Sequence, residues 1–160
     1  MRHKEGHAPS WPELRQFIVS RIREGGPAPF SQFMDWCLYQ PRYGYYCSEG
    51  IKIGRSGDYY TSPCVHPLFG GMVAKQLCQM NEVLNSEAFT ILEIGGGRGF
   101  LCEDILAWAK AQAPEFYRRL TYYALESSPG LLDEQRERLT EESGKGKVVW
   151  LSPAAMEKGQ

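Results

Sequence analysis

The chain has 160 residues, of which 42% are hydrophobic and 12% aromatic, so it is long and apolar enough for one domain with a buried core. Its 18 basic and 19 acidic residues nearly cancel, which gives no electrostatic reason to expect nucleic acid or an anionic membrane as a partner. No apolar run approaches the roughly 18 residues of a membrane span, and five cysteines without a C-x-x-C pair favour reduced thiols in a cytoplasmic protein.

Two helices are predicted near the N-terminus. Ser10 and Glu13 form a capping-box pattern, and apolar residues at helical spacing follow until Gly25-Gly26 ends the helix. Ser31 is expected to cap the second, shorter helix. Pro41 is expected to end it, because a proline disfavours helical backbone in the residue before it.

Residues 41–63 are predicted to form a long loop rich in glycine, proline and tyrosine. Loops of this length in compact chains are usually functional or disordered, and the many aromatic residues argue against disorder. A third helix is expected after Pro67. Its expected apolar stripe consists of Phe69, Met72, Val73, Leu77 and Met80.

The second half of the chain alternates strands with helices. Strands are predicted at residues 89–94, 120–125 and 147–151. Ser128 and Pro129 are expected to begin the helix after the second strand, as its cap and its first residue. The βαβαβ order implies a parallel sheet with right-handed crossovers. The residues expected to face inward from the helices are Leu101, Ile105, Trp108, Leu131, Leu132 and Leu139.

A glycine-rich turn follows the first predicted strand and is the most informative part of the chain. Glu93 stands near the end of an apolar run, and Gly95, Gly97 and Gly99 follow at alternate positions. Glycine lets backbone approach a ligand closely, and the N-terminus of the next helix offers unpaired N–H groups. A P-loop would need Gly-Lys-Ser/Thr, and a dinucleotide-binding turn would need a small residue where Phe100 stands. The E-x-G-x-G-x-G spacing instead resembles motif I of S-adenosylmethionine-dependent methyltransferases.

Glu126 supports this interpretation because it follows the second predicted strand directly. A carboxylate in that position can accept both ribose hydroxyls of an adenosyl group. Its separation from the turn exceeds the usual ~20 residues, and a longer first helix together with the segment Pro114–Arg119 accounts for the difference. A solvated acid at a strand end stays open as an alternative for Glu126, as does an ordinary tight turn for the glycines.

Four segments before the turn resemble a known family. They are residues 30–34 (FSQFM), 41–46 (PRYGYY), 53–63 (IGRSGDYYTSP) and 67–70 (PLFG). In this order they closely resemble the MidA family of S-adenosylmethionine-dependent methyltransferases, and the resemblance runs from about Ile18 to about Leu139. It implies a Rossmann-like fold, S-adenosylmethionine as cofactor and a protein substrate. Mitochondrial members of this family are protein arginine methyltransferases that act in the assembly of respiratory complex I.

The resemblance also implies which residues form the site. The block of residues 57–63 would fold over the cofactor, which makes Asp58, Thr61 and Ser62 candidate pocket residues. Asp58 is the best acidic candidate for orienting an arginine acceptor and taking up its proton, and no residue is firmly assigned as catalytic. The expected cofactor-binding residues are Glu93, Gly95, Gly96, Gly97, Gly99, Glu126, Ser127, Thr61 and Ser62.

The sequence departs from the family pattern in two places. Cys64 and His66 stand where the family usually has an acidic and a small polar residue. Because no other cysteine or histidine lies nearby in sequence, no metal is expected, and His66 is expected to cap a helix or to pack. Family members continue through a fourth strand and a motif that helps hold the acceptor, so we expect this chain to be an N-terminal portion of a larger enzyme, incomplete at its C-terminus.

The missing fourth strand would leave the apolar strand of residues 89–94 at an open sheet edge. We therefore expect the isolated chain to self-associate, unless the N-terminal helices or another chain cover this edge. Two alternatives to a methyltransferase stay open. One is a non-catalytic assembly or interaction module that keeps the turn as a relic or ligand sensor, and the other is an NAD-dependent enzyme.

The predicted fold class is α/β, a Rossmann-like methyltransferase sheet with three parallel strands. Residues 1–86 are expected to form a helical and loop region over the cofactor site, and residues 87–160 the first half of the cofactor-binding domain. The expected partner is a protein substrate such as a respiratory-complex subunit. The polar residues 1–10 lack the apolar centre of a signal peptide, and no arginine-rich leader is present, so we expect a cytoplasmic protein, or a matrix protein in a eukaryote.

Overall fold

The structure, a computed structural model, describes residues 11–47, 57 and 61–152. The chain divides into two compact units, Met1–Gly50 and Ile51–Gln160. The division predicted after residue 86 falls inside the second unit, and it stays a prediction. No helix in the part of the chain that the structure describes is long and apolar enough to cross a membrane.

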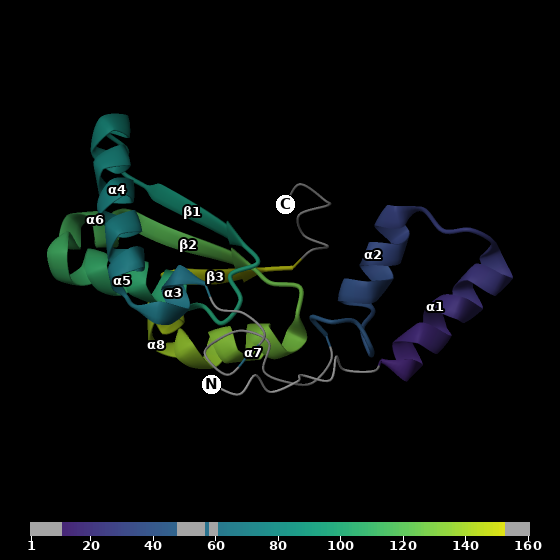
Figure 1. The fold of residues 1–160 in the computed structure, drawn as a ribbon. Coiled ribbons are helices and arrows are strands. Elements are labelled where there is room, and N and C mark those ends of the chain that lie inside the picture. Colours follow the sequence, from purple (N-terminus) through teal and green to yellow (C-terminus); the bar gives the residue numbers. More distant parts are fainter. Residues whose placement is uncertain (1–10, 48–56, 58–60, 153–160) are drawn as a thin grey trace, which may run out of the picture. The chain divides into compact units, whose positions relative to one another are not determined.

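The first unit contains two helices, α1 (Pro12–Gly25) and α2 (Phe30–Tyr39), both labelled in Figure 1. The rings of Phe17 on α1 and Trp36 on α2 meet edge to face, with 6.1 Å between their centroids. Aromatic pairs at this distance and angle add to the stability that burial of the rings provides. The two helices therefore pack through an aromatic contact.

The ends of these helices follow the prediction only in part. α1 starts at Pro12, whose fixed φ suits a first helical turn, and Ser10 lies outside the described residues. Ser31 is the second residue of α2, so the capping role predicted for it is wrong. α2 ends before Gln40, whose ψ of 123° is extended, as expected for the residue that precedes Pro41.

The second unit is built on a sheet of three parallel strands in the order β1-β2-β3 (Figure 1). The strands are β1 (Phe89–Ile94), β2 (Leu120–Leu125) and β3 (Val148–Leu151). The helices are α3 (Ser62–Val65), α4 (Leu68–Leu84), α5 (Phe100–Gln112), α6 (Pro114–Arg119), α7 (Pro129–Arg138) and α8 (Thr140–Gly144). The predicted α/β class and parallel βαβαβ order are therefore confirmed.

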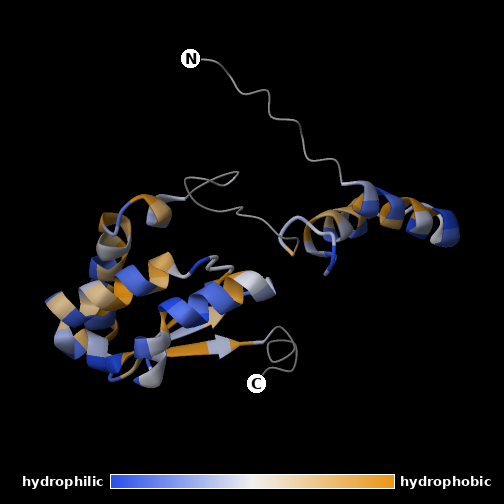
Figure 2. Cartoon of the chain, turned by 90° about the horizontal axis from the view of Figure 1, so that it is seen from below, coloured by the Kyte–Doolittle hydropathy of each residue, from blue (hydrophilic) through white to orange (hydrophobic). Residues whose placement is uncertain are grey.

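The alternation of side chains gives the sheet one covered face and one open face. On the covered face Phe89 pairs in register with Leu120, and both are buried in a core that includes Ile105 of α5. On the opposite face Leu92 is 48% and Ile94 67% exposed. Both connections step in the same direction along the sheet. Right-handed crossovers, the rule for parallel strands, would put the helices of both connections on one side of it. Figure 2 shows hydrophobic residues on the strands in orange.

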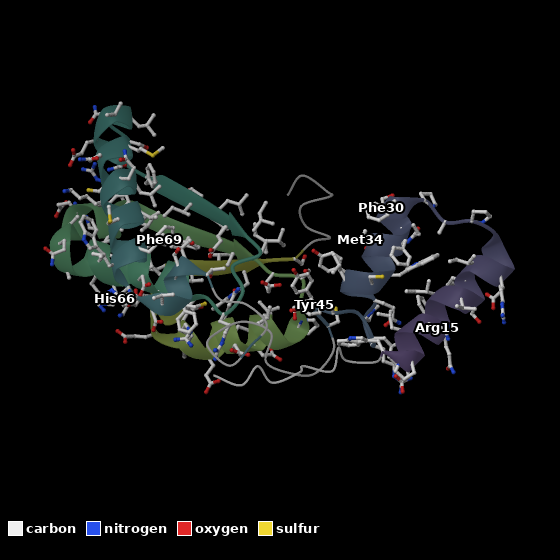
Figure 3. All side chains as sticks on the ribbon, in the orientation of Figure 1. Arg15, Phe30, Met34, Tyr45, His66 and Phe69 are labelled. Carbon is white, nitrogen blue, oxygen red and sulfur yellow. The ribbon has the colours of Figure 1, made fainter. Side chains whose placement is uncertain are left out.

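Helix α4 packs against α5 through small residues. A Cβ on Gly70 would overlap the Asp104 side chain of α5, and Ala74 is fully buried. This close approach decides which side of α4 faces inward. Of the predicted stripe, Val73 and Leu77 pack against the core, and Phe69 (Figure 3), Met72 and Met80 are exposed. The predicted stripe is therefore wrong for its larger members, because Gly70 and Ala74 occupy the contact.

Candidate functional site

The glycine turn connects the carboxyl end of β1 to α5. The N–H of Gly95 donates to the Leu125 carbonyl at 2.8 Å, which ties the turn to the end of β2. Gly99 is the N-cap of α5 and has a φ of 80°, a left-handed conformation that glycine adopts without steric cost. Its N–H donates to the Gly96 carbonyl at 3.1 Å and closes the turn. The turn therefore lies at the carboxyl edge of the sheet, where open parallel sheets bind ligands.

The Glu93 side chain lies against this turn. A Cβ on Gly96 would come within 2.6 Å of the Glu93 Oε2 atom, so only glycine allows so close an approach. The Tyr122 hydroxyl on β2 donates to the same oxygen at 2.9 Å. Burial raises the pKa of Glu93, the Tyr122 hydrogen bond opposes this, and the charge of Glu126 adds to the rise. Glu93 is therefore a partly buried acid that supports the turn.

Glu126 reaches the turn from the end of β2. Its Oε2 atom accepts the N–H of Gly97 at 3.0 Å, and its Oε1 atom accepts the N–H of Ser128 at 2.9 Å. The residue is only 8% exposed. A carboxylate has about four acceptor positions, so about two stay available after these bonds. The structure brings Glu126 to the turn, and its predicted contact with a ribose stays a prediction.

A cavity of about 150 Å³ opens beside the turn. This volume is below the ~300–1,000 Å³ of a complete small-molecule pocket, so the cavity fits one portion of a larger ligand. Its walls come from α3, the turn and the start of α5. The residues that line it are Thr61, Pro63, Cys64, Glu93, Gly95, Gly96, Gly97, Arg98, Phe100 and Leu101.

The other predicted site residues come from two separate parts of the sequence, the segment at and before α3 and the end of β2. Thr61 precedes α3 and lines the cavity, and Ser62 is the exposed first residue of α3. Ser127 is exposed and follows Glu126 directly. Asp58 lies outside the described residues. Binding of a cofactor by any of these residues stays a prediction.

The residues that depart from the family pattern have local structural roles. The Nδ1 atom of His66 accepts the N–H of Leu68 at 3.0 Å, so His66 (Figure 3) caps the start of α4, as predicted. The Sγ atom of Cys64 lies 3.6 Å from the Thr61 hydroxyl. Among residues 11–47, 57 and 61–152, no group of three or more His, Cys, Asp or Glu side chains is placed to hold a metal ion.

Two residues of α7 contact the turn and were missed by sequence reasoning. The Nε2 atom of Gln135 donates to the Gly97 carbonyl at 2.8 Å, and the Nε atom of Arg138 donates to the Arg98 carbonyl at 3.0 Å. Polar residues on an amphipathic helix are normally assigned to its solvent face. The sequence does contain one sign that Gln135 faces inward. It stands four residues before Leu139, and residues four apart lie on the same face of a helix.

Comparisons with known proteins also point to a site for S-adenosylmethionine. The model of a family of S-adenosyl-L-methionine-dependent methyltransferases matches residues 72–160. A relative from Caenorhabditis elegans, "Protein arginine methyltransferase NDUFAF7 homolog, mitochondrial", is 33% identical over 79% of this chain. The Drosophila melanogaster protein of the same name is 33% identical over 84% of this chain. The chain spans about 30% of the length of these two relatives.

A solved structure resembles the chain over most of its length. It is a crystal structure of a Burkholderia thailandensis protein bound to S-adenosyl-homocysteine, with 28% sequence identity and a TM-score of 0.74. The match covers 90% of this chain and 39% of the other. The sequence matches and the structural match thus point to the same family as the motifs around the glycine turn. This chain therefore belongs to the MidA-like family of S-adenosylmethionine-dependent methyltransferases.

Proposed function

We propose that this chain is the S-adenosylmethionine-binding part of a methyltransferase that modifies an arginine side chain of a protein. The observation that carries the proposal is the meeting of the glycine turn, Glu93 and Glu126 at the carboxyl edge of the sheet. The relatives named as protein arginine methyltransferases support the acceptor class. The solved structure with S-adenosyl-homocysteine supports the cofactor.

Each end of the cofactor has a candidate binding group. The cavity beside Gly95–Gly97 would take the methionine end, where the Glu93 carboxylate can face an ammonium group. Glu126, with Ser127 next to it, would take the ribose through the acceptor positions that its backbone bonds leave available. Thr61 and Ser62 would cover the site from α3.

Methyl transfer depends more on the alignment of acceptor, methyl carbon and sulfur than on a charged group beside the methyl. Bound S-adenosylmethionine would supply a methyl group for in-line displacement from a sulfonium. The turn would hold the methionine end in one position, so that the acceptor can approach along the required line. An arginine acceptor needs carboxylates that orient its guanidinium and accept its proton. Asp58 stays the acidic candidate in this chain, and no residue is assigned as catalytic.

The proposal extends to the acceptor protein and to the place where the enzyme acts. The acceptor protein would be a respiratory-complex subunit, an expectation that rests on the family resemblance alone. The protein would act in the cytoplasm or, in a eukaryote, in the mitochondrial matrix. The word "mitochondrial" in the relatives' names supports the second location.

The substitution Glu126→Ala tests the cofactor site. It should weaken S-adenosylmethionine binding by about 1–3 kcal/mol, because it removes charge-assisted bonds to the ribose and the contact that holds Gly97. Titration calorimetry measures the change, and Glu137→Ala on the exposed side of α7 is the matched control. Unchanged affinity in Glu126→Ala would remove Glu126 from the site.

The unaltered chain decides between the broader alternatives. If it does not bind S-adenosylmethionine, the proposed function is wrong. Binding followed by methyl transfer to an arginine-containing protein would support an enzyme. Binding without transfer would favour the non-catalytic module instead, and binding of a nicotinamide cofactor would favour the dinucleotide alternative.

A further inference from the structure

Gln135 is an almost fully buried polar residue beside the glycine turn. It lies on α7, and only 1% of it is exposed. Its Nε2 atom donates to the Gly97 carbonyl at 2.8 Å, and its Oε1 atom accepts the indole N–H of Trp150 on β3 at 3.2 Å. An indole N–H can only donate and a carbonyl can only accept, so these partners fix which way the amide points. Gln135 therefore bridges the turn to β3.

The bond to Gly97 fixes the orientation of one peptide group. In a trans peptide the C=O and the following N–H point in opposite directions. Because the Gly97 carbonyl points to α7, the N–H of Arg98 points away from α7. Gly97 and Arg98 both line the cavity beside the turn, and α7 contributes no residue to its lining in the described part of the chain. An N–H that points away from α7 can face the cavity, which Gly97 and Arg98 both line.

A second side chain of α7 fixes the next peptide. Arg138 donates to the Arg98 carbonyl at 3.0 Å, and the N–H of Gly99 bonds to the Gly96 carbonyl at 3.1 Å. The guanidinium of Arg138 also lies 3.9 Å from the ring centroid of Phe100, the first residue of α5. Neighbouring peptides of the turn are therefore held before any ligand arrives, which lowers the entropy lost on binding.

We propose that Gln135 is a positioning residue for the cofactor. By holding the Gly97 carbonyl, it presents the N–H of Arg98 to the carboxylate at the methionine end of S-adenosylmethionine. The inference rests on the proposed function for the identity of the ligand. The orientation of the peptide itself can be tested in the ligand-free protein.

Gln135→Met tests the proposal, because methionine has a similar length and forms neither hydrogen bond. The full chain is titrated with S-adenosylhomocysteine in a calorimeter, and Glu137→Met on the exposed side of the same helix is the control. Affinity should fall about tenfold in Gln135→Met, the scale of one unmade hydrogen bond, and stay unchanged in Glu137→Met. Equal affinity in Gln135→Met and the unaltered chain would overturn the proposal.

The amide signals of the turn separate positioning from general stability. In ¹⁵N-labelled, ligand-free protein, Gln135→Met should shift the Arg98 amide signal and speed its exchange with water, while the Ile105 amide in the middle of α5 keeps its shift. An unmoved Arg98 signal would overturn the proposal even if the unaltered chain bound no cofactor. If Gln135→Met does not fold, Gln135→Leu serves in its place, because leucine also forms neither hydrogen bond and favours helical backbone.

Discussion

At the scale of single residues, the partly buried Glu93 on β1 is paired with the buried Tyr122 on β2. The Tyr122 hydroxyl donates to the Glu93 carboxylate at 2.9 Å. Burial raises the pKa of both groups, and the charge of Glu93 raises the pKa of Tyr122 further. Tyr122 therefore stays a donor at any ordinary pH, and Glu93 keeps its proton to a higher pH in the folded than in the unfolded chain.

This pair predicts a pH dependence of folding stability. Between the ordinary Glu93 pKa of 4.5 and its raised folded value, the folded chain binds more protons than the unfolded chain. The free energy of unfolding should therefore fall as pH rises through this window. Urea unfolding of the full chain at several pH values measures the slope. Glu93→Gln, which cannot ionise, should make the slope less negative, and an unchanged slope would contradict a raised pKa of Glu93 in the folded chain.

The residues of the site differ in how visible they are in the sequence. Glu93 and Glu126 could be found because each stands at the end of an apolar strand and the glycines mark the turn between them. Gln135 and Arg138 could not, because their role depends on which carbonyls α7 meets after folding. Such contacts join positions almost 40 residues apart, and neither propensity nor spacing encodes them.

At the scale of elements, the start of α5 depends on Gly99. A residue with a Cβ pays about 1–2 kcal/mol to adopt left-handed backbone, and a Cβ here would lie 3.1 Å from the Gln135 Cγ atom. Gly99→Ala should therefore destabilise the chain by roughly this amount, as urea unfolding would measure.

Gly130 in α7 provides the matched control for Gly99. It has open space where a Cβ would lie and no positive φ. Gly130→Ala should leave stability unchanged or raise it by up to about 1 kcal/mol, because alanine favours helical backbone. Equal effects of the two substitutions would show that the turn does not require the left-handed conformation at Gly99.

Helices and strands were predicted well where apolar residues recur with a single period, helical or strand-like. The first two strands match the predicted ranges, and α4 begins directly after Pro67 as expected. The side of α4 that faces inward was wrong, because small residues at Gly70 and Ala74 let α5 approach and large apolar residues stay outside. Short helices such as α3 were not predicted, since a single turn leaves too few residues for a periodic signal.

At the scale of the whole molecule, the second unit leaves apolar surface uncovered. Leu92 and Ile94 on β1 and Val149 on β3 are exposed on the open face of the sheet. β1 also lies at the edge of the sheet among the described strands. Exposed apolar faces and open strand edges favour association between chains.

We therefore predict that the isolated chain self-associates. Light scattering should give a mass above that of one chain, and replacing Leu92 and Ile94 together by threonine should lower it. Val83→Thr is the control, because Val83 is 86% exposed but belongs to α4 and not to a strand, and it should change nothing. A single species with the mass of one chain would contradict this prediction.

The proposed function requires the backbone between Glu93 and Phe100 to bind the amino-acid end of the cofactor. A crystal structure of the full chain with S-adenosylhomocysteine tests it most directly. We predict density for the amino-acid end of the ligand in the cavity beside Gly95–Gly97, with the ribose hydroxyls on Glu126. Density for the ligand elsewhere, or an empty cavity at saturating ligand, would contradict the account.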